Sequence, residues 1–277
     1  MNEQRTKHLQ EMVQDRTQLR TTFDQDALLY DQARPGYPEA LFHDIVTLSG
    51  IPSAGRILEI GCGTGQATLP MARRGYRIHC IELGANLAAL ARRNLAAYPL
   101  VSIQTEAFET WQLEKEAFDL VLSATAFHWI DPAIAYQKTA QALKPSGSIA
   151  LFWHEHIQSE ASQGFFEQVE QIYRRHVPEQ EEKYHPLLWP DEVAEPVKAD
   201  IEQTCLFGEV TVRRYSWDVT YDADSYLRLL DTYSNHRILD KQRHDRLFHE
   251  IADLINTRYN GRITKGYLAI LYMAHRK

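Results

Sequence analysis

Two hydrophobic periodicities alternate between residues 56 and 155. Short aliphatic runs are typical of buried strands, and they are separated by stretches in which hydrophobic residues recur every three or four positions, as on one face of a helix. Strands are predicted at 56–60, 76–82, 101–106, 118–125 and 147–155, and helices at 66–75, 84–98 and 132–145. Strands and helices in strict alternation indicate an α/β fold, in which helices cover both faces of a parallel sheet.

The pattern changes on both sides of this region. Before it, an amphipathic helix is predicted at 5–23, and a second helix begins at Pro38 and ends at Gly50. After it, the sequence predicts a helix at 162–177, an irregular proline- and acid-rich stretch at 178–197, a strand at 209–220, a helical region with a hydrophobic stripe from Leu247 to Ile255, and a strand at 266–276. Seven strands result, but their alternation alone does not give their order in a sheet.

Composition and charge narrow the class of protein. Of the 277 residues, 44% are hydrophobic and 24% are charged, as in ordinary globular proteins. No apolar stretch is long enough to span a bilayer, and the first residues lack an apolar signal core, so a cytoplasmic protein without membrane contact is expected. The net charge of -7 argues against a nonspecific nucleic-acid binder.

A glycine-rich turn follows the first strand of the α/β region, in the sequence RILEIGCGTGQAT (56–68). Glycines let the backbone N–H groups of such a turn approach a nucleotide closely. Gly65 is followed by Gln66 and Ala67 rather than by Lys-Ser or Lys-Thr, so the turn is not a P-loop for ATP. Counted from Gly61 or from Gly63, the dinucleotide fingerprint fails at its sixth position.

Two acidic residues bear on the nucleotide that this turn binds. Glu59 lies inside the strand, two positions before Gly61, where a carboxylate would serve a pyrophosphate poorly and tolerate a sulfonium or an ammonium group well. Glu82 ends the second strand and is placed to accept hydrogen bonds from a ribose diol. Because several nucleotide cofactors contain ribose, Glu82 does not discriminate between them.

Five sequence blocks in this order resemble the class I S-adenosylmethionine-dependent methyltransferases. The blocks are ILEIGCGTGQAT, IHCIE, TEAFETWQL, FDLVLSATAFHWID and LKPSGSIAL, within residues 20–155. The resemblance is greatest to the type-11 small-molecule branch, which includes enzymes acting on trans-aconitate and on quinone precursors. It implies a Rossmann-like fold with a mostly parallel seven-stranded sheet, helices on both faces, and a helical lid.

The resemblance also implies a division of the chain and a set of cofactor residues. Residues 1–50 would close over the cofactor, 51–155 would form the binding core, 156–205 a lid, and 206–277 the last two strands with a helical insertion between them. The residues that match cofactor-binding positions are Tyr30, Arg34, Glu59, Gly61, Cys62, Gly63, Thr64, Gly65, Glu82, Leu83, Glu106, Ala107, Phe108 and Ser123. Glu106 departs from the aspartate usual in the family, which leaves a side-chain contact from this position open.

The segment after the fourth strand bears on the methyl acceptor. It reads SATAFHWID and lacks the Pro-Pro-aromatic turn of enzymes that methylate exocyclic amines, so oxygen, carbon, sulfur and carboxylate acceptors remain. His128 is the candidate catalytic base, with packing against Trp129 as the alternative. Trp129, Tyr233 and Arg237 are candidates for acceptor binding, although Arg237 is equally explained as a solvated side chain.

The remaining alternatives concern metal and function. In the triplet HEH, His154 and His156 share one face of a strand and Glu155 points away, so at most two ligands converge and no metal is expected. The predicted function is S-adenosylmethionine-dependent methylation of a small-molecule acceptor. An RNA-directed methyltransferase, a non-catalytic S-adenosylmethionine-binding protein and a nicotinamide oxidoreductase are the alternatives. The sequence carries no signal of oligomeric state.

Overall fold

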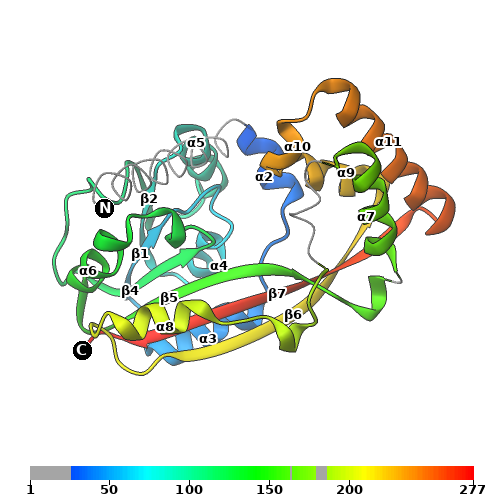
Figure 1. Cartoon of the computed structure of the whole chain (residues 1–277). Helices are drawn as coiled ribbons and strands as arrows, with labels where there is room; N and C mark the ends of the chain where they lie inside the picture. The colour runs from blue at the N-terminus through cyan, green and yellow to red at the C-terminus, as the bar shows by residue number, and fades with distance from the viewer. Residues whose placement is uncertain (1–25, 163, 179–185) are drawn as a thin grey trace, which may run out of the picture.

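A computed structural model describes residues 26–162, 164–178 and 186–277. Its centre is a seven-stranded sheet with the strand order β3-β2-β1-β4-β5-β7-β6 (Figure 1). The strands are β1 (Arg56–Ile60), β2 (Arg77–Glu82), β3 (Val101–Thr105), β4 (Phe118–Ala124), β5 (Leu143–Ile157), β6 (Thr211–Asp222) and β7 (Arg262–His275). Strands β1 to β5 pair in parallel, whereas β7 lies antiparallel between β5 and β6. The predicted Rossmann-like fold class is therefore confirmed.

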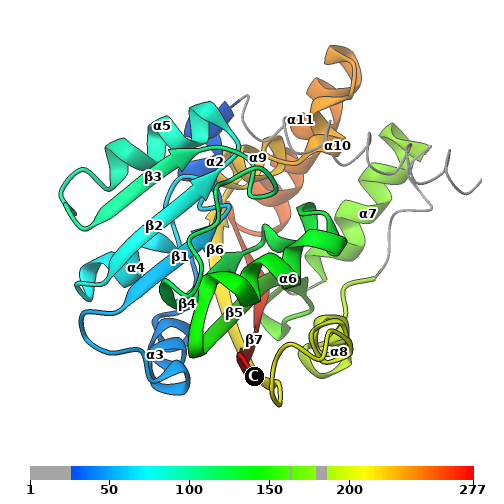
Figure 2. The ribbon, with the colours of Figure 1, turned by 90° about the vertical axis from the view of Figure 1, so that its left-hand side faces the viewer.

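Helices cover both faces of this sheet. Figure 2 shows the strands between α3 (Glu39–Ser49), α4 (Thr68–Arg73) and α5 (Ala85–Asn94) on one side and α6 (Pro132–Ala142) and α8 (Pro196–Gln203) on the other. Alternate residues of β1 show why both faces need cover, because Ile57 packs into the apolar cluster with α3 and α4, and Leu58 into the cluster with α6 and α8. Each face of the sheet thus has its own hydrophobic core.

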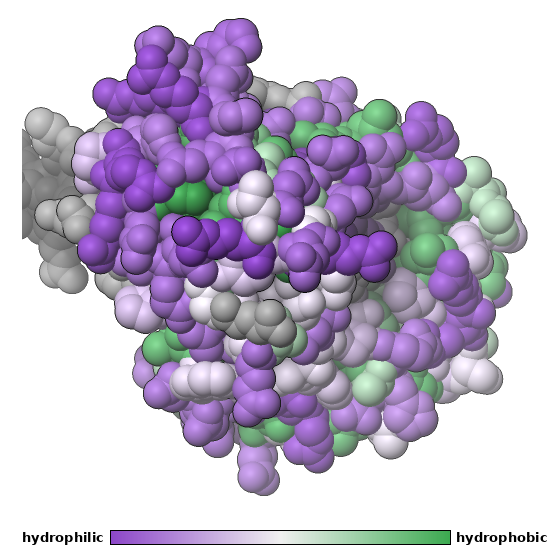
Figure 3. Space-filling view, turned by 90° about the vertical axis from the view of Figure 1, so that its right-hand side faces the viewer, coloured by the Kyte–Doolittle hydropathy of each residue, from purple (hydrophilic) through white to green (hydrophobic). Residues whose placement is uncertain are grey.

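A third hydrophobic cluster lies beyond the parallel part of the sheet. Strands β6 and β7 are long enough to reach past it, and their far ends pack against α7 (Phe165–His176), α9 (Ala223–Asp231) and α11 (Lys241–Arg258) (Figure 1). The short helices α2 (Ala27–Ala33) and α10 (Ser234–Arg237) lie next to this group. The outer face of the group is largely hydrophilic, with hydrophobic residues scattered over it (Figure 3). Its apolar side is therefore turned inward.

The structure differs from the sequence-based elements at a few positions. Residues 143–145, predicted as the end of a helix, begin β5, because Lys144 precedes Pro145 and is thereby disfavoured in the helical conformation. Helix α2 lies in a segment for which no element was predicted, whereas the helix predicted at 5–23 lies outside the described residues. Strand β5 continues past residue 155, where the sequence-based boundary between the binding core and the lid was placed. The division of the chain into 1–50, 51–155, 156–205 and 206–277 stays a prediction.

No described helix combines the length and the apolar composition needed to cross a bilayer.

Candidate functional site

A pocket opens at the edge where the parallel strands end. Strand order reverses between β1 and β4, and α/β folds bind ligands in the crevice that such a reversal leaves at the carboxyl ends of the strands. The pocket has a volume of about 260 Å³. Its lining comes from α2 and its C-cap, the glycine turn, the end of β2, α5, the segments after β3 and β4, and β5. It comprises Tyr30, Arg34, Ile60, Gly61, Gly63, Ile81, Glu82, Leu83, Leu87, Glu106, Phe108, Ala124, Thr125, Ala126, His128, Trp129, Ile130 and His154.

The glycine turn forms the floor of this pocket. Gly61 has φ 70°, and a Cβ built on it would lie 2.4 Å from the Cβ of Ala126, so the turn and the segment after β4 are in close contact. Gly63 has φ 57°, but a Cβ on it would meet no atom of the described residues within 4 Å, apart from its two chain neighbours. The space above Gly63 is therefore open pocket, as required if a ligand lies along the backbone there.

Glu82 connects the end of β2 to this turn. Its carboxylate accepts hydrogen bonds from the backbone N–H groups of Gly63 at 2.7 Å and Gly84 at 2.8 Å. The side chain is buried and lines the pocket. A carboxylate can accept more than one hydrogen bond on each oxygen, so this side chain can both support the turn and border the pocket.

Arg34 borders the pocket on the side opposite the sheet. Its guanidinium lies 4.3 Å from the ring centre of Tyr233 and 5.3 Å from that of Tyr30, and it donates to the carbonyl of Thr232 at 3.4 Å. The Nε of Arg34 is buried and has no hydrogen-bond partner in the described part of the chain. A buried donor without a partner is costly, so this guanidinium is suited to an anionic group of a ligand.

Glu59 lies within the protein rather than in the pocket. Its side chain is 1% exposed, and its Oε1 has no partner among the described residues. Burial raises the pKa of Glu59 to about 8, opposed by a hydrogen bond with Thr68 and increased further by the charge of Glu82. The carboxyl is thus protonated near neutral pH, which removes the sequence-based argument that its negative charge would select the ligand.

Several other sequence-predicted cofactor residues do not line the pocket. Ser123 is buried and donates to the carbonyl of Ile60 at 2.8 Å, which ties β4 to β1. Cys62 packs in the core, where a hydrogen bond with Cys80 and burial raise the pKa of its thiol. Thr64, Gly65 and Ala107 are likewise absent from the lining. These residues shape the turn and the strand ends around the pocket.

His128, the predicted catalytic base, lies in the pocket and accepts a hydrogen bond that bears on this role. The indole Nε1–H of Trp153 donates to Nδ1 of His128 at 2.9 Å. An indole N–H only donates, so Nδ1 accepts and the proton of the neutral imidazole is on Nε2. While this hydrogen bond is in place, the lone pair of Nδ1 is occupied and is not available to remove a proton. Trp129 lies beside this ring and lines the pocket as well.

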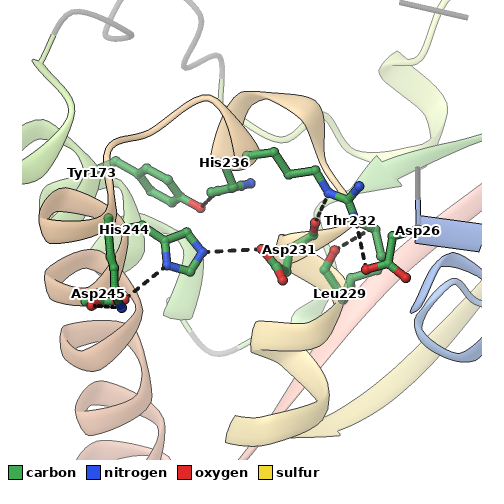
Figure 4. A network of polar contacts seen from close by, with 10 residues as sticks. Asp26, Tyr173, Leu229, Asp231, Thr232, His236, His244 and Asp245 are labelled. Carbon is green, nitrogen blue, oxygen red and sulfur yellow. Dashed lines mark hydrogen bonds and ion pairs between the residues drawn. The ribbon is translucent and has the colours of Figure 1, made fainter. Parts of the chain in front are cut away.

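The two predicted acceptor residues of the late helices occupy different environments. Tyr233 stacks on Arg34 and lines a second cavity, described below. Arg237 lines neither cavity, because its Nε donates to the carbonyl of Asp231 at 2.7 Å and its guanidinium pairs with Asp26 at 3.5 Å. Figure 4 shows these two aspartates in a polar network that includes His244. Arg237 thus joins α10 to the start of α2.

The structure adds residues that the sequence analysis did not assign to the site. Thr125, at φ 51°, follows β4 and shares a hydrogen bond of 2.7 Å with the hydroxyl of Tyr37. His154 lines the pocket, and its ring lies 6.3 Å from that of His156, on the same face of β5 as the alternation predicted. No group of three or more metal-ligating side chains occurs in the described ranges. The HEH triplet is the sequence signal for this position, because it places His154 and His156 on one face of a strand.

Comparison with known proteins agrees with this geometry. Residues 58–151 match the family of methyltransferase domains of type 11. This chain carries a class I methyltransferase domain. The cofactor of such a domain is S-adenosylmethionine, as the sequence predicted. The methyltransferase domain extends from the third residue of β1 to the middle of β5 and contains the glycine turn and Glu82.

Relatives share this domain and differ in what they act on. The chain is 29% identical to an uncharacterized methyltransferase of Mycobacterium tuberculosis over 143 residues, which are 52% of this chain and 56% of that protein. It is 32% identical to the malonyl-[acyl-carrier protein] O-methyltransferase of Geobacter sulfurreducens over 146 residues, 50% of this chain and 54% of the relative. The chain thus covers about half the length of the relatives that it matches.

Solved structures share the fold over most of the chain. A candidate type II methyltransferase from Anaeromyxobacter dehalogenans superposes with a TM-score of 0.59 at 22% identity, covering 87% of this chain and 97% of the other. Phosphoethanolamine N-methyltransferase 2 of Haemonchus contortus, solved with S-adenosyl-L-methionine, superposes with a TM-score of 0.53 at 17% identity, covering 91% of this chain and 57% of that one. At these identities the likeness concerns the fold.

Proposed function

We propose that this chain is an S-adenosylmethionine-dependent methyltransferase that acts on a small-molecule acceptor at an oxygen, a carbon, a sulfur or a carboxylate. When bound, S-adenosylmethionine supplies an activated methyl group on a sulfonium sulfur, so the protein mainly orients the acceptor and excludes water. The observation that carries the small-molecule part of the proposal is a second cavity of about 390 Å³ next to the pocket at the strand ends. This volume lies in the range typical of small-ligand sites.

The two cavities adjoin across a thin wall of side chains. Two pairs of side chains separate the cavities. In the first pair, Arg34 lines the first cavity, and its guanidinium lies over the ring of Tyr233, which lines the second. In the second pair, His154 lines the first cavity and His156 lines the second. An acceptor in the second cavity would have only this wall between it and a ligand bound at the glycine turn.

Residues of the first cavity would hold the cofactor by chemistry that each side chain already offers. Glu82 would accept hydrogen bonds from the ribose hydroxyls, and the unpartnered Nε of Arg34 would donate to the methionine carboxylate. Leu83 and Phe108 would pack on the adenine, with Glu106 at its edge. His128 and Trp129 also line this cavity and would border the acceptor there.

Calorimetric titration of the full chain with S-adenosylmethionine, S-adenosylhomocysteine and NADH tests the cofactor. We expect micromolar binding of the first two and none of NADH; binding of NADH alone would overturn the proposal. Transfer of a labelled methyl group from S-adenosylmethionine to small acids and phenols, and in parallel to RNA, then tests the acceptor. Labelling of RNA alone would favour the RNA-directed alternative, and binding without transfer to either would favour a non-catalytic protein.

A further inference from the structure

A lysine is buried at the far end of β7, where the strand pattern calls for an apolar residue. Lys265 lies between Ile263 and Tyr267 on the face of β7 that packs against α7, α9 and α11, and both of these neighbours belong to the hydrophobic cluster there. Only 4% of Lys265 is exposed. Burying an ammonium group costs free energy unless an anion pairs with it, so the groups around Lys265 show whether the protein itself supplies that anion.

The described neighbours of Lys265 are rings and neutral polar groups. Its Nζ lies 3.5 Å from the hydroxyl of Tyr233 and within 5.9 Å of the ring centres of Phe166, Tyr233 and Tyr267. The hydroxyl of Tyr233 also contacts Nε2 of His156 at 3.0 Å. Within the described ranges, no carboxylate lies within ion-pair distance of Lys265.

The charges around this group do not balance it. Burial lowers the pKa of Lys265 to about 7, and the positive charge of Arg34 lowers it further. Burial also lowers the pKa values of His154 and His156, so both imidazoles are neutral. Among the described residues, a positively charged Lys265 therefore faces a second cation and two neutral histidines, without an anion at ion-pair distance.

Two carboxylates line the second cavity, and each has a partner other than Lys265. Both come from α7: Glu167 is exposed and accepts from Gln158 at 3.2 Å, and Glu170 pairs with Arg174 at 2.7 Å. Glu167 is exposed and Glu170 is partly buried, whereas Lys265 is buried. The remaining lining is mainly aromatic and aliphatic, with Phe166, Val169, Tyr173, Tyr226, Leu187 and Leu230.

From this arrangement we infer that the second cavity is the acceptor chamber and that it takes a small molecule with an oxyanion at one end and an apolar or aromatic body, with Lys265 as the counter-charge. That the bound molecule is the methyl acceptor rests on the proposed function, since its reacting atom would have to reach the side chains between the two cavities, namely Arg34, Tyr233, His154 and His156. The anion site itself rests on Lys265 and its surroundings. A carboxylate and a phosphate offer the same chemistry to Lys265, and the experiment separates them.

Calorimetry on the full chain saturated with S-adenosylhomocysteine provides the test. The probes are benzoate, phenyl phosphate and the neutral isostere benzamide. We expect saturable binding of at least one of the two anions, with benzamide at least about tenfold weaker, the scale of losing a charged hydrogen bond. Whichever anion binds more tightly identifies the oxyanion class.

Two variants make the result specific to Lys265. Lys265→Met keeps the length of the side chain and should weaken anion binding at least about tenfold while leaving benzamide binding unchanged. Lys115→Met, in the exposed loop between β3 and β4, is the matched control and should bind like the wild type. Anion binding should also take up a proton, seen as different heats in imidazole and Tris buffers, and this uptake should disappear in Lys265→Met.

Three outcomes would overturn the inference: equal binding of benzamide and the anions, unchanged anion binding by Lys265→Met, or no saturable binding of either anion. Binding of S-adenosylhomocysteine by the wild type and by Lys265→Met is measured in the same series. It shows that the variant is folded, and it separates the two proposals. If S-adenosylhomocysteine does not bind but the anion does, the proposed function is overturned and the anion site is kept. If S-adenosylhomocysteine binds and the anion does not, only the anion site is overturned.

Discussion

The carboxylate of Glu82 accepts a hydrogen bond from the backbone N–H of Gly63 at 2.7 Å. One side chain thus belongs at once to the end of β2, to the glycine turn after β1 and to the lining of the pocket. The turn and the proposed ribose site are therefore mechanically coupled, and a change at Glu82 is expected to affect both.

Replacement of Glu82 by alanine should weaken the binding of S-adenosylhomocysteine by about 1–3 kcal/mol, because a charged acceptor of the ligand and the support of Gly63 are lost together. Calorimetric titration measures this loss. Glu114→Ala, which removes a half-exposed partner of Arg56, is the control and should leave the affinity unchanged. Equal affinities of Glu82→Ala and the wild type would exclude the ribose role.

Glu59→Gln should change how stability depends on pH. Because the pKa of Glu59 is raised to about 8 in the folded protein, the folded state holds a proton that the unfolded state releases above pH 4.5. The free energy of unfolding of the wild type therefore falls as pH rises from about 4.5 to 8. The neutral amide avoids this loss, so Glu59→Gln should be more stable by roughly 2–4 kcal/mol at pH 8.5 and about equal near pH 5. Urea unfolding across this range provides the measurement, and a constant difference between the two proteins would contradict the buried, protonated state.

The stability gained by Lys265→Met should decrease as pH rises, opposite to the trend expected for Glu59→Gln. The pKa of Lys265 is lowered to about 7 in the folded protein, so between pH 7 and 10.5 the unfolded chain binds a proton that the folded one lacks. The wild type consequently gains stability as pH rises through this interval. The advantage of Lys265→Met should be on the order of a few kcal/mol at or below pH 7 and should shrink toward pH 10. Denaturant midpoints of both proteins at pH 6.5 and 9.5 provide the comparison. A stability difference between the two proteins that is the same at both pH values would contradict the lowered pKa of Lys265.

His128→Ala tests whether the imidazole orients the acceptor rather than removing its proton. Since Nδ1 is occupied by the indole of Trp153, we expect turnover to fall roughly tenfold through lost positioning, with the affinity for S-adenosylhomocysteine unchanged. The pH–rate profile should keep its shape in the variant. A titration step near pH 6.5 that is present in the wild type and absent in His128→Ala would instead identify a catalytic base.

Much of the pocket could be predicted because its parts are local in sequence. A strand, a turn with glycines at positive φ and an acid at the end of the next strand are set by neighbouring residues, and parallel strands bring their carboxyl ends to one edge. The resemblance added Arg34 and Tyr30, both of which line the pocket. The catalytic role of His128 stays a prediction, and the hydrogen bond that bears on it comes from Trp153 on the neighbouring strand, which no local pattern around His128 indicates.

The sequence by itself thus determined the α/β class, the seven strands and the glycine turn, since hydrophobic periodicity and backbone conformation act over a few residues. Only the tertiary structure decided the second cavity. Arg34, His156, Tyr233 and Lys265 come from α2, β5, the α9–α10 turn and β7, and they meet because β7 inserts antiparallel beside β5 and carries its far end under the helices. No short-range pattern encodes such a meeting, because burial of a lysine is a property of what packs around it.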